Sequence, residues 1–105
     1  MPKQLLRLSP IALMSIKALE PDCGLKLNDS GCDVQRLQII LKELGLYNGA
    51  LNGFFDLKTE RALLGLQQYL EVTTTGQLDI TTWYQLTYWS EEIEQQRHGR
   101  ELVAH

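Results

Sequence analysis

The sequence has few of the residues that most often carry enzymatic or metal chemistry. It contains two cysteines and two histidines, and both histidines, His98 and His105, lie in a polar C-terminal tail. No serine or cysteine pairs with a histidine in a pattern that predicts a nucleophilic site. Cys23 and Cys32 are nine residues apart, which permits a disulfide but is not the close spacing of two zinc ligands on one turn. The sequence therefore predicts no catalytic residues, no metal site and no cofactor.

The sequence also lacks an excess of positive charge. Its net charge is -3, from 10 basic and 13 acidic residues, and the two signs are interspersed. Nucleic acids and anionic lipids attract concentrated positive charge, so neither is expected as a partner. The helix expected over residues 80–89 contains no arginine or lysine, which argues against a DNA-reading helix-turn-helix.

Long apolar runs are missing as well. Residues 5–19 are mildly apolar, but Arg7 and Lys17 interrupt them, Pro10 lies within them and no small-residue cleavage site follows. The stretch is too short and too charged to cross a bilayer. We therefore expect no membrane insertion and, from the sequence as written, a cytoplasmic protein, or one of the cell envelope if another route exports it.

What is present is the composition of a single globular domain. With 44% hydrophobic and 22% charged residues, the chain has enough apolar side chains for one compact core. Ser9 and Pro10 suit the start of a helix, which we expect over residues 11–19 as an appendage to the main domain. The chain then divides into a helical extension over residues 1–24, the main domain over residues 25–89 and a polar tail over residues 90–105.

Three further helices are expected inside the main domain. Ser30 with Asp33 resembles a capping box that opens the first of them, which Gly45 ends. Asp56 and Asp79 can cap the second and third, because an aspartate side chain accepts hydrogen bonds from free amides at a helix start. Residues at helical spacing predict the buried faces: Val34, Leu37, Leu41 and Leu44; Thr59, Ala62, Leu63, Leu66 and Leu70; and Trp83, Leu86 and Tyr88 or Trp89.

An internal repeat links the starts of the last two helices. Residues 53–59 and 76–82 both read glycine, spacer, large apolar residue, aspartate, two spacers and threonine. In each copy the glycine suits a turn, the apolar residue suits the core and the aspartate suits a cap. A second echo relates the apolar pattern around Gln38 to that around Gln67. A glutamine beside a buried stripe more often satisfies a neighbouring loop's backbone than binds a ligand, so we expect a structural role for both.

In this order, the landmarks resemble the peptidoglycan-binding domain family over residues 25–87. The matching segments are Leu27-Asn28-Asp29-Ser30-Gly31-Cys32-Asp33-Val34, Leu37-Gln38, Leu44-Gly45-Leu46-Tyr47-Asn48-Gly49 and Asn52-Gly53-Phe54-Phe55 with Thr59, then Gln67, Gly76 and Thr82-Trp83. The resemblance implies an all-α fold, a compact three-helix bundle, here with an extra N-terminal helix. It also implies a non-catalytic module that holds cell-wall glycan or stem peptide. The chain departs from the family pattern at Asn52, Asp56 and Thr75.

The loop between residues 47 and 56 is the predicted ligand site. A wall glycan is amphipathic, so a binder needs exposed rings for sugar C–H surfaces and fixed polar groups for hydroxyls and amides. The predicted ligand-binding residues are Tyr47, Asn48, Asn52, Phe54, Asp56 and Thr59. The alternative is that the two asparagines only satisfy turn geometry, while Phe55 and Tyr47 belong to the core.

Two functions are compatible with these features. The first is recognition of peptidoglycan. The second is an intracellular protein–protein interaction module that keeps the fold but not wall binding, with the amphipathic N-terminal segment and acidic tail as contact surface. A fold alone does not choose between them, and the sequence does not indicate an oligomeric state.

Overall fold

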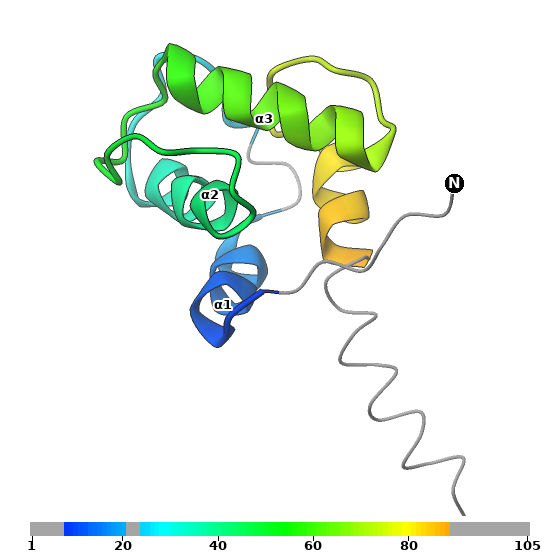
Figure 1. The fold of residues 1–105 in the computed structure, drawn as a ribbon, viewed down its shortest axis with the longest axis horizontal. Helices are drawn as coiled ribbons and strands as arrows, with labels where there is room; N and C mark the ends of the chain where they lie inside the picture. Colours follow the sequence, from blue (N-terminus) through cyan, green and yellow to red (C-terminus); the bar gives the residue numbers. More distant parts are fainter. Residues whose placement is uncertain (1–7, 21–23, 89–105) are drawn as a thin grey trace, which may run out of the picture.

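The computed structural model of the protein describes residues 8–20 and 24–88 (Figure 1). Its regular elements are α1 (Pro10–Ala18), α2 (Cys32–Glu43), α3 (Leu57–Leu70) and a further helix over residues 80–88. Within the described ranges there is no strand, and two isolated antiparallel bridges pair Leu25 with Leu78 and Ser30 with Phe54. The predicted all-α bundle with an extra N-terminal helix is confirmed.

One core joins all of these helices. Figure 1 shows α3 along one edge of the molecule, with α2 near its first turns and the helix of residues 80–88 near its last. The predicted buried faces of α2 and α3 are confirmed, except that Leu44 is only partly buried. The largest fully buried apolar side chains are Ile16, Leu37, Ile40, Leu41, Phe55, Leu63, Leu66, Leu70, Leu78 and Leu86. The loops before α3 and before residue 80 therefore each supply one large core residue, as the repeat predicts.

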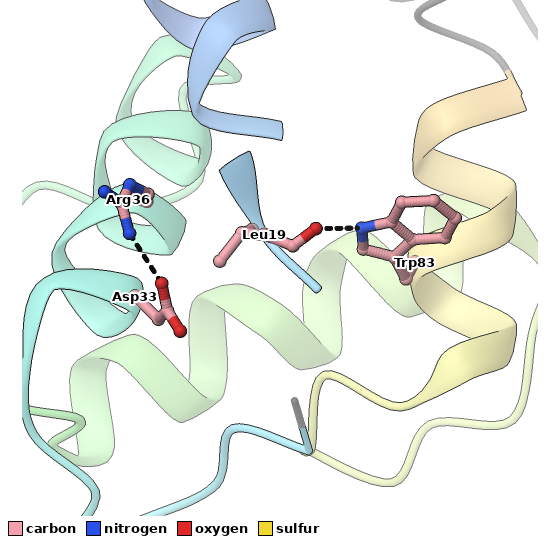
Figure 2. Close-up of polar contacts among 4 residues, drawn as sticks. All are labelled: Leu19, Asp33, Arg36 and Trp83. Carbon is pink, nitrogen blue, oxygen red and sulfur yellow. Dashed lines mark hydrogen bonds and ion pairs between the residues drawn. The ribbon is translucent and has the colours of Figure 1, made fainter. Parts of the chain in front are cut away.

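The N-terminal helix α1 is part of this core and not an appendage. It begins as predicted, with Ser9 as the N-cap and Pro10 in the first turn. Ile16 and Leu19 are 1% and 2% exposed and belong to the same buried cluster as α2 and α3. The Trp83 indole Nε1 donates a hydrogen bond to the Leu19 carbonyl over 3.1 Å (Figure 2). The core thus continues across the boundary expected at residue 24, while the division into domains stays a prediction.

The start of α2 differs from the predicted capping box. Gly31 is the N-cap residue, and no side chain accepts a hydrogen bond from the free amides there. Ser30 lies instead in an antiparallel bridge to the loop before α3, and the Gly31 amide donates to the Gly53 carbonyl over 2.9 Å. Asp33 accepts a hydrogen bond from Arg36 Nη1 over 2.6 Å (Figure 2). The capping-box prediction is wrong because pairing with a distant loop holds this segment extended.

The last described helix packs with only part of its predicted face. Leu86 is fully buried and Trp83 is partly buried against the core, as expected. Tyr88, one of the two alternatives for the end of this face, is 56% exposed and is not part of the buried core. Trp89, the other residue considered for that role, lies outside the described residues. Gly45 follows the end of α2 with a left-handed φ of 77°, as predicted for a helix end.

Candidate functional site

One buried glutamine of α2 holds the loop before α3. Gln38 Oε1 accepts a hydrogen bond from the Gly53 amide over 2.9 Å. Its Nε2 donates to the Phe54 carbonyl over 2.9 Å and to the Thr59 hydroxyl over 3.1 Å. The Thr59 amide and hydroxyl both donate to Asp56 Oδ1 over 2.9 Å. These five residues, the first network, connect the core to the capping aspartate and confirm the predicted cap and the structural role of the glutamine.

The second copy of the repeat builds the same arrangement. Gln67 Oε1 accepts a hydrogen bond from the Gly76 amide over 3.0 Å, and its Nε2 donates to the Gln77 carbonyl and the Thr82 hydroxyl, each over 2.9 Å. Asp79 Oδ1 accepts from the Thr82 amide over 2.9 Å and from the Thr82 hydroxyl over 2.6 Å. We call these residues the second network. The sequence repeat is therefore a repeat of hydrogen-bonded structure.

The glycine in each network has a backbone that other residues rarely adopt. Gly53 and Gly76 have φ values of 75° and 76°, in the left-handed region. A Cβ added at Gly53 would lie 2.9 Å from the Gly31 carbonyl oxygen, and one at Gly76 would lie 3.2 Å from Glu60 Cγ. Both loops are thus fixed by backbone geometry as well as by the glutamines.

The polar residue before each glycine closes the same turn. Asn52 Oδ1 accepts a hydrogen bond from the Phe54 amide over 3.0 Å and from the glutamine of its network over 3.3 Å. Thr75 Oγ1 accepts from the Gln77 amide over 3.2 Å and from its own glutamine over 3.1 Å. Either an amide or a hydroxyl oxygen serves here, which explains how the fold accommodates the departures from the family pattern at these positions.

A larger hollow lies beside the first network, where the loop meets the first turn of α3. It is open to solvent and has a volume of about 670 Å³, within the range of roughly 300–1,000 Å³ usual for ligand sites. The residues that line it are Leu27, Asn28, Gly49, Ala50, Asn52, Phe54, Asp56, Leu57 and Lys58. Phe54 is 44% exposed and Leu57 is 57% exposed. The larger hollow therefore offers apolar surface next to amide and carboxylate groups.

A smaller hollow of about 250 Å³ adjoins the larger one. It is lined by Leu46, Tyr47, Asn48, Lys58, Arg61 and Ala62, so Lys58 borders both hollows. Tyr47 is 4% exposed, and its hydroxyl donates a hydrogen bond to the Ala50 carbonyl over 2.6 Å. The tyrosine side chain therefore anchors the loop between residues 47 and 50 to the core.

The six predicted ligand-binding residues fall into three groups. Asn52, Phe54 and Asp56 line the larger hollow. Tyr47 and Asn48 line the smaller one, the tyrosine as a buried residue and the asparagine as an exposed one. Thr59 is fully buried, lines neither hollow and serves the first network. The contacts of all six with a ligand stay a prediction.

Leu57, Lys58 and Arg61 border the hollows but were absent from the predicted site. A signal for them is present in the sequence, because all three lie off the apolar stripe of α3 and within five residues after the capping aspartate. An exposed leucine beside cations at the start of a helix indicates a surface with both apolar and charged character. Asn28 was also missed, since its position depends on pairing between loops: its amide donates to the Phe55 carbonyl over 2.9 Å.

Hydrogen bonding lowers the pKa of both capping aspartates. The Thr59 amide bonded to Asp56 lowers the pKa of that carboxyl, against a smaller opposing effect of burial. Burial raises the pKa of Asp79, but hydrogen bonds from the Thr82 hydroxyl and amide and from the Thr75 hydroxyl outweigh it, so the pKa is lowered overall.

Asp56→Ala and Asp79→Ala are each expected to lower the free energy of unfolding at pH 7 by about 0.5–2 kcal/mol, through loss of the cap. A carboxyl with a lowered folded-state pKa stabilises the fold above its unfolded value near 3.8. That part of the stabilisation is lost as pH falls through the folded-state pKa, so the difference from wild type shrinks in acid. Urea unfolding over a pH series measures this difference in stability between variant and wild type.

Asp56→Asn is the control variant, because asparagine keeps a capping oxygen but does not titrate and so loses the pH dependence. Unchanged stability in both alanine variants would contradict the assignment of the caps.

The described residues contain neither a metal-site cluster nor a membrane-spanning helix. Among residues 8–20 and 24–88, no three histidine, cysteine, aspartate or glutamate side chains gather as a metal site requires. Cys32 is an exposed free thiol, while Cys23, His98 and His105 lie outside the described residues. In the same ranges, no helix combines the length and apolar character needed to cross a bilayer.

Comparison with family models identifies the family of the chain's central part. A family model described as "Putative peptidoglycan binding domain" matches residues 30–86, more than half of the chain. No curated protein matches the chain. The matched range contains both networks and most residues of the two hollows, and it excludes α1.

Proposed function

The chain belongs to the peptidoglycan-binding domain family, and we propose that it binds peptidoglycan, without cleaving it, at the two hollows beside the loop between α2 and α3. Membership in the family associates the chain with the bacterial cell wall. The place of action under this proposal is the cell envelope, and the module acts by holding the polymer.

The observation that carries the proposal is the mixed character of the larger hollow. Phe54 and Leu57 expose apolar surface there, and Asn28 and Asn52 supply amide groups within the same wall. A saccharide or a short peptide presents C–H surface and hydrogen-bonding groups side by side, which this wall complements. The equivalent position to Phe54 in the second network is Gln77, so the apolar ring distinguishes the first loop from its copy.

A pull-down with purified sacculi tests the proposal. We expect the wild-type protein to be retained and Leu57→Ala or Phe54→Ala to be retained about tenfold less, because each loses roughly 1–2 kcal/mol of apolar contact. Ile80→Ala is the matched control. Ile80 follows the second capping aspartate as Leu57 follows the first, and it is 49% exposed against 57%.

The Ile80→Ala control shows whether loss of retention is specific to the larger hollow or follows from removing any exposed apolar side chain. Equal loss of retention in Leu57→Ala and Ile80→Ala would show that the larger hollow is not the binding surface. Retention of the wild type no greater than that of an unrelated acidic protein of similar size would overturn wall binding itself.

A second candidate function is protein docking by the same fold. The observation that favours it is an apolar stripe on the helix of residues 80–88, where Ile80, Tyr84 and Tyr88 are 49%, 59% and 56% exposed at helical spacing. Under this alternative, Ile80→Ala and Tyr84→Ala weaken binding to a protein partner, and Leu57→Ala does not. The same variants therefore separate the two functions.

A further inference from the structure

Two cations gather at the smaller hollow. Lys58 and Arg61 are three residues apart in the first turns of α3, a spacing that places them on one side of the helix. Both are exposed and both line the smaller hollow, next to Asn48. This positive charge is a local feature, since it contrasts with the net charge of -3 that the chain as a whole carries.

The surroundings leave this charge largely uncompensated. None of the described residues that line the smaller hollow is acidic. Asp56 lies near Lys58 and offsets part of its charge, but it serves as the helix cap and forms no ion pair with Lys58, and it does not line the smaller hollow. Glu60 lies between the two cations in sequence and is directed elsewhere, against Gly76 of the second network. In the described part of the chain, the ion pairs join Lys26 to Asp29 and Arg36 to Asp33, and neither cation takes part.

The two hollows together favour a ligand that has an amphipathic body and a charged end. Lys58 borders both, so a ligand whose body lies against Phe54 and Leu57 can direct a charged end towards Lys58 and Arg61. Ammonium and guanidinium groups bind carboxylates through charge-assisted hydrogen bonds, which are stronger than hydrogen bonds between neutral groups. The site therefore selects for an anionic end and an amphipathic body.

We propose that Lys58 and Arg61 bind a carboxylate of the peptidoglycan stem peptide, so that the peptide and not the glycan chain is the part of the polymer that is recognised. This inference rests on the proposed function. Where the glycan bears a stem peptide, its own carboxyl group forms the amide bond to that peptide, so the glycan carries no charge there. The stem peptide, in contrast, carries free carboxylates along a short chain with small apolar side chains. The stem peptide thus matches both the cations of the smaller hollow and the mixed wall of the larger one.

Binding to defined soluble fragments tests the inference. The probes are a synthetic stem tetrapeptide, the same peptide with its carboxyl groups amidated, and an uncharged N-acetylglucosamine oligomer. We expect the full chain to bind the tetrapeptide, with an affinity that falls as salt is added, and to bind the amidated form about tenfold more weakly. The N-acetylglucosamine oligomer is expected to bind no better than the amidated peptide.

The variants separate charge recognition from folding. Lys58→Gln and Arg61→Gln are exposed substitutions and are each expected to weaken binding of the tetrapeptide about tenfold, with no change for the amidated form. Lys42→Gln, an exposed cation in the last turn of α2, is the matched control and leaves both affinities unchanged.

Three outcomes overturn the inference in distinguishable ways. If sacculi retain the protein but the amidated peptide or the N-acetylglucosamine oligomer binds as tightly as the tetrapeptide, stem-peptide recognition fails and wall binding stands. If Lys58→Gln with Arg61→Gln leaves tetrapeptide affinity intact, the carboxylate is bound elsewhere. Loss of sacculus retention in the wild type overturns the proposed function and, with it, the inference.

Discussion

Gln38→Leu is expected to lower the free energy of unfolding by about 2–4 kcal/mol, because it leaves buried backbone groups without partners. Leucine fills a similar volume but neither donates nor accepts hydrogen bonds. The buried Gly53 amide then loses its acceptor, and the Thr59 hydroxyl and Phe54 carbonyl lose a donor. Each buried group left unsatisfied costs about 1–3 kcal/mol, which is large against the roughly 5–15 kcal/mol that stabilises a typical domain.

Gln67→Leu is the matched variant, since it breaks equivalent hydrogen bonds in the second network. We expect a similar loss of stability, measured by urea unfolding followed by circular dichroism. The two variants differ in binding: only Gln38 positions the loop that lines the hollows, so at a temperature where both are folded, only Gln38→Leu weakens retention by sacculi. A loss of stability below about 1 kcal/mol in both would contradict the importance of the networks.

The repeat predicts both the helix starts and the residues that cap them. Asp56 and Asp79 were predicted as caps because the signal is local: aspartate precedes a helix by one residue and meets the amide three positions on. The structural role of Gln38 and Gln67 followed from their place beside a buried stripe. The hydrogen-bond partners of each glutamine could not be predicted, because they lie far along the chain, up to 21 residues away in the case of Gln38 and Thr59.

Features that depend on distant pairing were missed. Ser30 has the sequence of a helix cap, but a bridge to Phe54 places it in extended backbone. The loop between α2 and α3 is predicted as a structural element, and its role as a ligand site stays a prediction. The burial of Tyr47 and Thr59 and the position of Lys58 at the border of two hollows depend on tertiary packing. Local patterns do not encode such packing.

The burial of α1 is a further case of this kind. The helix is apolar on more than one side, with Ile16 and Leu19 buried and Ile11 and Met14 exposed by 66% and 69%. Periodicity therefore does not indicate which side packs, or whether any does. The contact that settles it, from Trp83 to the Leu19 carbonyl, spans 64 residues of sequence.

Ile16→Ala is expected to lower the free energy of unfolding by about 2–5 kcal/mol, since it removes a fully buried side chain and leaves a cavity between α1 and the rest of the core. An effect of this size requires that α1 unfolds together with the family domain and not before it. Urea unfolding, followed both by circular dichroism and by tryptophan fluorescence, measures the loss and shows whether the two signals change in one transition.

Ile11→Ala is the control on the same helix. The substitution is chemically identical and brings the same gain in helix propensity, but it removes a side chain that is 66% exposed, so we expect a change within about 0.5 kcal/mol. The difference between the two variants therefore isolates the contribution of burial. Similar small effects in both would show that α1 does not stabilise the domain, and the core would then consist of the family fold without the N-terminal helix.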